Sequence, residues 1–201
     1  MRPWGEVPQL LADAPGAPLS QPLYRCLDLG FVFRRIASKS GFNFLHSSTH
    51  ASRYTFEAGP RRLYLSLEKE TAEVEFRFGI ERLLDPSRSP SPVSTALLVV
   101  HCQVTTMLDL TNPDVQTLLA TTPDELTREW EEPDRHPSSI TQQLGTTVHD
   151  HGRFSGIIFP SARHPTGKNV LIFPDRLDHG QDKVILHLLD RGQTVHEEQL
   201  R

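Results

Sequence analysis

The chain has 201 residues, of which 37% are hydrophobic, and this is enough apolar material for one buried core. Its formal net charge of -4 and sequence pI of about 6.2 argue against the clustered positive charge of a nucleic-acid-binding surface. We see no secretory or membrane-spanning segment in the sequence. We therefore expect a cytoplasmic protein that contacts neither nucleic acid nor membrane.

Residues 1–21 are interrupted by prolines and lack a long apolar stretch, which predicts a loosely ordered N-terminal arm. The rest of the chain, 22–201, is predicted to form a single domain. Cys26 and Cys102 each lie within an apolar run that is typical of a strand, so we expect two buried free thiols.

Apolar spacing predicts the elements of the first half in chain order. They are a strand at 23–27, a helix at 31–38, a polar loop at 47–60, a strand at 63–67 and a helix at 70–84.

In the second half, a surface linker at 85–92 precedes an apolar run that predicts a central strand. The further elements are that strand at 95–104, a short strand at 108–110, helices that begin near Pro113 and Pro123, a helix at 139–149, and strands at 156–159, 169–173 and 183–188. Strands outnumber long helices, and no repeat is visible.

Ten histidines raise the question of a metal site. The tightest cluster is His149-Asp150-His151, but no HExxH or CxxC spacing accompanies it, so we predict no metal and leave the role of His149 and His151 open. A phosphate-binding glycine loop and a GxSxG nucleophile motif are also missing from the sequence.

Four segments, taken in order, resemble the RES domain, a family named for an arginine, a glutamate and a serine. The segments are 23–25 (LYR); 53–54 (RY) with 63–66 (LYLS) and 71–75 (TAEVE); 108–111 (LDLT) with Trp130 and 141–145 (TQQLG); and 156–163 (GIIFPSAR) with 169–173 (NVLIF). Their order and spacing carry the resemblance, which covers 23–188.

The resemblance implies an α+β fold, with ADP-ribosyltransferase-like central β-sheets flanked by helices, as a RES domain over 22–201. It implies that NAD is a substrate, cleaved between nicotinamide and ribose. It further implies a toxin neutralised by an Xre-type helix-turn-helix antitoxin, with a possible homo-oligomer inside that complex.

By this resemblance Arg25 and Arg53 orient the substrate, because a guanidinium fork can meet two pyrophosphate oxygens at once. The local sequence leaves other interpretations open. Arg25 can face solvent from an edge strand or pair with a structural carboxylate, and Arg53 can be a solvated loop residue.

Glu75 is the predicted catalytic carboxylate, and Glu73 is the alternative. Glu73 has Arg77 four residues later, which is the arrangement of an exposed ion pair on a helix. Glu75 instead stands three or four residues from a small and apolar set: Ala72, Phe78 and Gly79.

Tyr64 alternates with leucines, so we expect it to point into the cleft and contact NAD, or else to be a core tyrosine. Ser161 follows an apolar strand and Pro160. The resemblance makes it a catalytic hydrogen-bond donor that also contacts the substrate; the alternative is a turn or helix-cap serine.

The leading hypothesis is an NAD glycohydrolase or phosphorylase, and the sequence does not determine whether water or phosphate accepts the ribose. A first alternative is ADP-ribose transfer onto a protein. A second is an inactive interaction module, because the loop 51–56 lacks the asparagine and leading glycines usual in the family.

Overall fold

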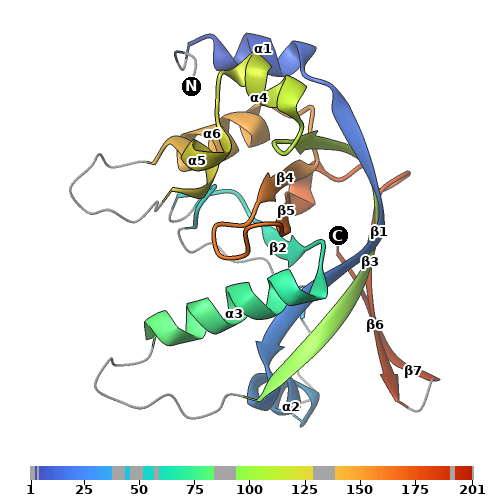
Figure 1. Cartoon of the computed structure of the whole chain (residues 1–201). Coiled ribbons are helices and arrows are strands. Elements are labelled where there is room, and N and C mark those ends of the chain that lie inside the picture. Colours follow the sequence, from blue (N-terminus) through green and yellow to red (C-terminus); the bar gives the residue numbers. More distant parts are fainter. Residues whose placement is uncertain are drawn as a thin grey trace.

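The computed structural model describes residues 3, 5–37, 44–45, 52–56, 59–83, 94–128, 139–190 and 193–200 (Figure 1). Its helices are α1 (Val7–Asp13), α2 (Leu29–Ala37), α3 (Lys69–Leu83), α4 (Pro113–Leu119), α5 (Pro123–Thr127) and α6 (Ile140–His151), with a 3-10 turn η1 (Pro174–Arg176). Its strands are β1 (Gly16–Asp28), β2 (Leu63–Ser66), β3 (Thr95–Asp109), β4 (Gly156–Pro160), β5 (Lys168–Ile172), β6 (Lys183–Asp190) and β7 (Gln193–Gln199).

The predicted α+β single-domain class is confirmed, and so is each predicted helix. The strands differ from the prediction in three places. The strand predicted at 23–27 is the last part of β1, which begins at Gly16. The short strand predicted at 108–110 is the end of β3, which continues from Thr95 to Asp109 without a break. The strand β7 was not predicted, because its sequence QTVHEEQ is polar and lacks apolar alternation; pairing with β6 holds it in place.

The strands form one sheet in the order β1-β2-β5-β4-β3-β6-β7, and β1 also pairs with β3. β1 runs antiparallel to β3 from Gly16↔Leu108 to Asp28↔Thr95, and at Tyr24 it also pairs with Ser66 of β2. Five strands therefore close into a ring, and β6 and β7 extend from β3 (Figure 1). The ring brings β1, β2 and β5 next to one another, and these strands carry Arg25, Tyr64, Ser66 and Asn169, which line the cleft described below.

β4 and β5 are buried on both faces between two apolar cores. Along β5 and the residue that follows it, Val170 and Ile172 belong to the first core, while Leu171 and Phe173 belong to the second. Successive side chains of a strand point to opposite faces, so an apolar run without alternation is the pattern of a strand covered on both sides. Helices α1, α4, α5 and α6 supply residues to the second core.

For residues 5–21 the prediction of a loosely ordered arm is wrong, because they form α1 and the start of β1. Val7 and Leu11 of α1 have no exposed surface, and Leu11 packs in the second core. The prolines are compatible with order because Pro8 lies in the first turn of α1, where its missing N–H has no helical partner to lose. Arg153 caps the other end of α1 by donating to the carbonyls of Leu11 (2.9 Å) and Ala12.

Both cysteines are buried and free, as predicted. Within the described ranges, no helix is long and apolar enough to cross a membrane.

Candidate functional site

A cleft of about 480 Å³ opens between α3 and the strands β1, β2 and β5. The three residues that the spacing grouped with Glu75 on α3 all line this cleft beside it. Its lining residues are Tyr24, Arg25, Cys26, Ser52, Arg53, Tyr64, Leu65, Ser66, Ala72, Glu75, Phe76, Phe78, Gly79, Phe159, Arg163 and Asn169.

The Glu75 carboxylate is held at one oxygen by two donors. Ser161 Oγ donates to Glu75 Oε1 at 2.6 Å, and Asn169 Nδ2 donates to the same Oε1 at 2.7 Å. Ser161 and Asn169 are both buried, at 4% and 8% exposure, and they come from the two neighbouring strands β4 and β5 or their ends. Bonds between a neutral donor and a charged acceptor are stronger than neutral pairs, so this carboxylate has a defined orientation.

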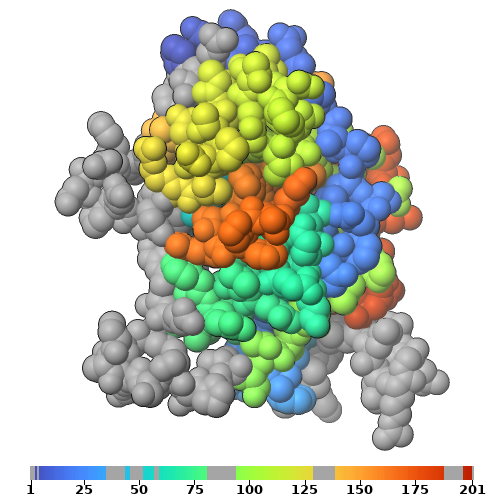
Figure 2. All heavy atoms as spheres, viewed as in Figure 1, coloured from blue at the N-terminus to red at the C-terminus, as the bar shows by residue number. Residues whose placement is uncertain are grey.

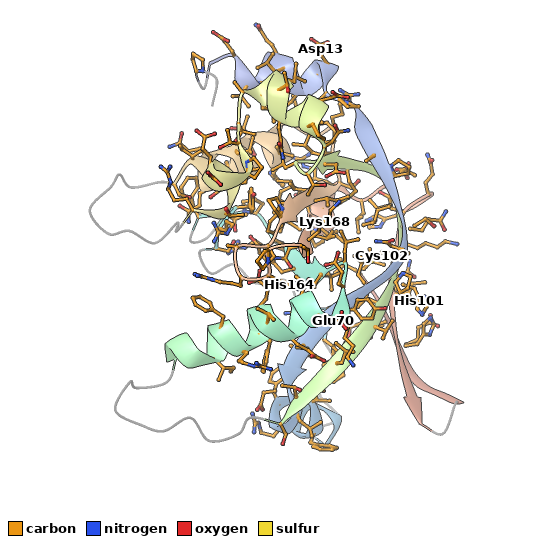
Figure 3. The ribbon with its side chains drawn as sticks, viewed as in Figure 1. Asp13, Glu70, His101, Cys102, His164 and Lys168 are labelled. Carbon is orange, nitrogen blue, oxygen red and sulfur yellow. The ribbon has the colours of Figure 1, made fainter. Side chains whose placement is uncertain are left out.

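The loop 161–167 that carries Ser161 is fastened to α3. Ser161 Oγ accepts from the backbone N–H groups of Arg163 (3.1 Å) and His164 (3.0 Å). The His164 ring bonds the Thr71 hydroxyl at 2.8 Å, and a Cβ on Gly167 would lie 2.2 Å from that hydroxyl oxygen. In Figure 2 the orange segment that includes this loop lies against the teal surface of α3, and Figure 3 shows His164 beside that helix. The loop that carries Ser161 therefore lies close to α3, the helix that carries Glu75.

Arg25 lines the cleft from β1, and its Nη1 donates to the carbonyl of Phe44 at 3.0 Å. Burial lowers the pKa of the Arg25 guanidinium, and the carboxylate of Glu198 in β7 acts in the opposite direction. Glu198 also accepts from the backbone N–H groups of Phe44 (2.7 Å) and Leu45 (2.9 Å). The alternatives left open for Arg25 were exposure to solvent and pairing with a structural carboxylate. Glu198 is such a carboxylate, and the Arg25 side chain nevertheless lines the cleft.

Tyr64 lines the cleft through a half-buried side chain on β2. Its hydroxyl lies 2.6 Å from Ser52 Oγ, and its ring meets Phe159 edge to face at 6.2 Å between centroids. Burial raises the pKa of the Tyr64 phenol, while the bond to Ser52 lowers it to a smaller extent. The phenol is therefore neutral at physiological pH and can both donate and accept.

Arg53 lines the cleft from the turn 52–55, but one nitrogen of its guanidinium forms hydrogen bonds outside the cleft. Its Nη1 donates to the carbonyls of Leu126 (3.3 Å) and Arg128 (2.5 Å) at the end of α5. Arg53 therefore ties the turn to α5, and any contact with a ligand is made from this anchored position.

The structure gathers all five predicted site residues. Arg25, Arg53, Tyr64 and Glu75 line the cleft, and Ser161 reaches it through its bond to Glu75. The alternative carboxylate, Glu73, pairs with Lys69 at 3.7 Å on the partly exposed side of α3, instead of with the predicted Arg77.

Two residues of the cleft, Asn169 and Arg163, were not predicted from the sequence as site residues. Asn169 pairs with Phe159 of the neighbouring strand and directly precedes the apolar run at 170–172, and a polar side chain at such a position could have signalled it. Arg163 places its guanidinium carbon 3.5 Å from the Phe78 ring centroid, which is a cation–π contact across the cleft. No local pattern predicts that contact.

The histidines of the cluster 149–151 make hydrogen bonds and packing contacts within the fold. His149 bonds Asp175 through Nε2 (2.8 Å) and Asp150 through Nδ1 (3.0 Å), which joins the end of α6 to η1. His151 packs beside Phe154, at 6.4 Å between ring centroids. Among the described residues, no group of three or more His, Cys, Asp or Glu side chains could hold a metal ion.

The chemical capacity of the cleft follows from these groups. A guanidinium from β1 and another from the turn 52–55 suit an anionic ligand. The rings of Tyr64, Phe78 and Phe159 offer aromatic contacts to a planar group. A fixed carboxylate, Glu75, can stabilise positive charge that develops beside it in a reaction.

Comparisons with known proteins agree with the fold described above. The RES domain model matches residues 22–195 of the chain. None of the curated proteins matches it in sequence. Among solved structures, a chain in the crystal structure of the M. tuberculosis MbcT–MbcA toxin–antitoxin complex is similar, with a TM-score of 0.59 and 16% sequence identity. The match covers 96% of this chain and 91% of that one, and at this identity it shows a shared fold.

Proposed function

The chain belongs to the RES-domain family, and from this premise we propose that it cleaves the bond between nicotinamide and ribose in NAD. One observation carries the proposal. Glu75 stands in the wall of a cleft of about 480 Å³, held at one oxygen by Ser161 and Asn169, and the same cleft contains arginine side chains for an anionic ligand.

The reaction needs few protein groups. The bond between ribose C1′ and the nicotinamide ring nitrogen breaks, and its electron pair leaves with nicotinamide, which becomes neutral. No general acid is required, since the leaving group already carries positive charge. An oxygen of water or phosphate forms the new bond to C1′, and when the acceptor is water its proton passes to the solvent.

In this proposal Glu75 acts on the ribose. Positive charge develops at C1′ as the bond breaks, and the carboxylate stabilises that charge while it accepts a hydrogen bond from a ribose hydroxyl. Ser161 keeps the carboxylate in place through its 2.6 Å bond. Arg25 and Arg53 bind the pyrophosphate, and Tyr64 packs against the nicotinamide end of the substrate.

We propose further that the protein is a toxin of the cytoplasm, restrained by an antitoxin with an Xre-type helix-turn-helix part. The support is family membership and the fold shared with a chain of the MbcT–MbcA toxin–antitoxin complex. Assembly into more than one copy of each chain belongs to the same proposal.

The test is release of nicotinamide from NAD by the purified protein, with and without phosphate. Glu75→Ala and Glu75→Gln are compared with Glu73→Ala, a control that removes a carboxylate two residues away on the same helix. We expect release by the wild type and by Glu73→Ala, and a loss of about 100-fold or more in both Glu75 variants.

A requirement for phosphate would identify a phosphorylase, and release without it a hydrolase. If the folded wild type releases no nicotinamide in either buffer, the proposed reaction is wrong. Incubation with labelled NAD and bacterial proteins then distinguishes the two alternative functions. A protein ADP-ribosyltransferase transfers the label to a protein, whereas an inactive interaction module labels none.

A further inference from the structure

Asn169 is a buried polar residue whose amide is bonded at both ends. It lies in β5, 8% exposed, directly before the apolar residues 170–172. Its Nδ2 donates to Glu75 Oε1 at 2.7 Å, and its Oδ1 accepts from Ser66 Oγ at 2.8 Å. A buried amide is costly unless its donors and acceptors find partners, and these two bonds meet that requirement.

Ser66 determines which way the amide faces. A carboxylate can only accept, so the amide nitrogen of Asn169 must face Glu75 and its oxygen must face a donor. The Ser66 hydroxyl is that donor, and it is 4% exposed. Ser66 and Asn169 are direct partners in the β2–β5 ladder, which fixes the distance between their side chains.

The two donors of the carboxylate meet at one oxygen. Ser161 and Asn169 both bond Oε1 of Glu75, and among the described residues no hydrogen bond is made to Oε2. The carboxylate is therefore held on one side, which leaves its other oxygen for a ligand in the cleft.

We propose that Asn169 is a positioning residue for Glu75: with Ser66 behind it, Asn169 fixes the carboxylate so that Oε2 is presented to the ribose of the substrate. The proposal rests on the function proposed above. Asn169 acts through Glu75 and takes no proton from the substrate. Its removal is expected to lower kcat, because the carboxylate loses its alignment with the developing charge, while substrate binding by the arginines continues.

The main variants are Asn169→Ala and Ser66→Ala, assayed for kcat and KM of nicotinamide release. We expect kcat to fall about 10- to 100-fold in Asn169→Ala with KM changed less than about threefold, and a smaller fall in Ser66→Ala. Asn112→Ala is the control, because Asn112 also uses its side chain in a local bond, as the cap of α4, and lies outside the cleft. It is expected to lose stability without losing kcat.

Asn169→Asp adds a readout that a merely structural role would not change. The introduced carboxyl has the same shape but repels Glu75 when ionised, and it can donate to Oε1 only when protonated. Activity of this variant relative to the wild type is therefore expected to recover as the pH falls. A flat ratio across the pH range would contradict the proposal.

Chemical labelling of Glu75 does not require NAD cleavage, so it tests the positioning role independently of the proposed function. Modification of Glu75 by a water-soluble carbodiimide and an amine, followed by mass spectrometry, reports on the carboxylate itself. We expect the rate to rise severalfold in Asn169→Ala and to change little in Asn112→Ala. If the wild type does not cleave NAD but the labelling rate rises, the proposed function fails and the positioning role stands. Unchanged kcat, a rise in KM alone, or an unchanged labelling rate would overturn the positioning role.

Discussion

Arg25 and Glu198 lie on different strands, β1 and β7, and both bond the same short piece of backbone. Arg25 donates to the carbonyl of Phe44 at 3.0 Å, while Glu198 accepts from the N–H groups of Phe44 and Leu45 at 2.7 and 2.9 Å. Glu198 also offsets part of the cost of burying the Arg25 charge, since it acts against the burial that lowers the pKa of the guanidinium. Glu198 therefore supports a residue that lines the cleft, although Glu198 itself lies beyond the RES domain match, which ends at residue 195.

Glu198→Gln is expected to weaken substrate binding. The variant removes the charge that balances Arg25 and leaves one of two backbone N–H groups without its acceptor, which costs roughly 1–3 kcal/mol. We expect KM for NAD to rise about three- to tenfold, because Arg25 is less well placed for the pyrophosphate. Steady-state kinetics and thermal unfolding measure both effects. The control is Glu197→Gln. Glu197 lies next to Glu198 on β7 and makes a partly exposed pair with His187 of the neighbouring strand β6. Equal effects in the two variants would remove the special role of Glu198.

Ser161→Ala is expected to reduce kcat by about 10- to 100-fold, because Glu75 loses one of its two donors. The variant also removes the acceptor for the N–H groups of Arg163 and His164. Ser155→Ala is the matched control, since Ser155 is equally buried and its hydroxyl bonds Arg176 and Asp182 outside the cleft. Both variants should lose stability in urea unfolding, and only Ser161→Ala should lose kcat. Full turnover by Ser161→Ala would exclude its part in the reaction.

Gly145→Ala is expected to destabilise the protein. Gly145 lies in α6, and a Cβ there would be 1.8 Å from the carbonyl oxygen of Tyr54, so the helix or the turn 52–55 must shift. Overpacking of this kind typically costs about 1–3 kcal/mol, measurable by urea unfolding. Gly79→Ala in α3 has no heavy atom within 4 Å of the added Cβ and should instead gain up to about 1 kcal/mol. A stable Gly145→Ala variant would show that the two segments are not in close contact.

Leu11→Ala tests whether α1 belongs to the folded domain. Leu11 has no exposed surface and packs in the second core, so its truncation is expected to cost about 2–5 kcal/mol of unfolding free energy. Gln9→Ala changes an exposed residue of the same helix and should stay within about 0.5 kcal/mol. If Leu11→Ala were as mild as Gln9→Ala, α1 would be only loosely attached.

The two thiols are expected to resist alkylation by iodoacetamide. Burial raises the pKa of Cys102 to about 12, so only about one molecule in 10,000 carries the thiolate at pH 8. Burial also raises the pKa of Cys26, which lines the cleft. Alkylation should become faster as the pH rises, and excess NAD should slow it at Cys26 only. Mass spectrometry assigns each site. Fast reaction of Cys102 in the folded protein, or NAD protection of Cys102, would contradict this prediction.

The local sequence pattern was sufficient to predict most of the helices and strands. The helix α3 was predicted at 70–84 and runs over Lys69–Leu83, because its apolar spacing is a property of neighbouring residues. The same spacing separated Glu75, beside the small residues of the cleft, from Glu73, which pairs with Lys69. The arm predicted over 1–21 failed because its prolines were taken as signs of disorder, although Pro8 fits the first turn of α1.

By itself the sequence determined most of the elements, the family resemblance and the residue types of the site, since each of these follows from neighbouring residues or from motif order. Only the tertiary structure decided which groups touch. Asn169 lies 94 residues from Glu75, and Glu198 lies 154 residues from Phe44. Contacts over such separations depend on the closure of β1 onto β3 and on the register of β2 with β5, and those are set by packing of the whole domain.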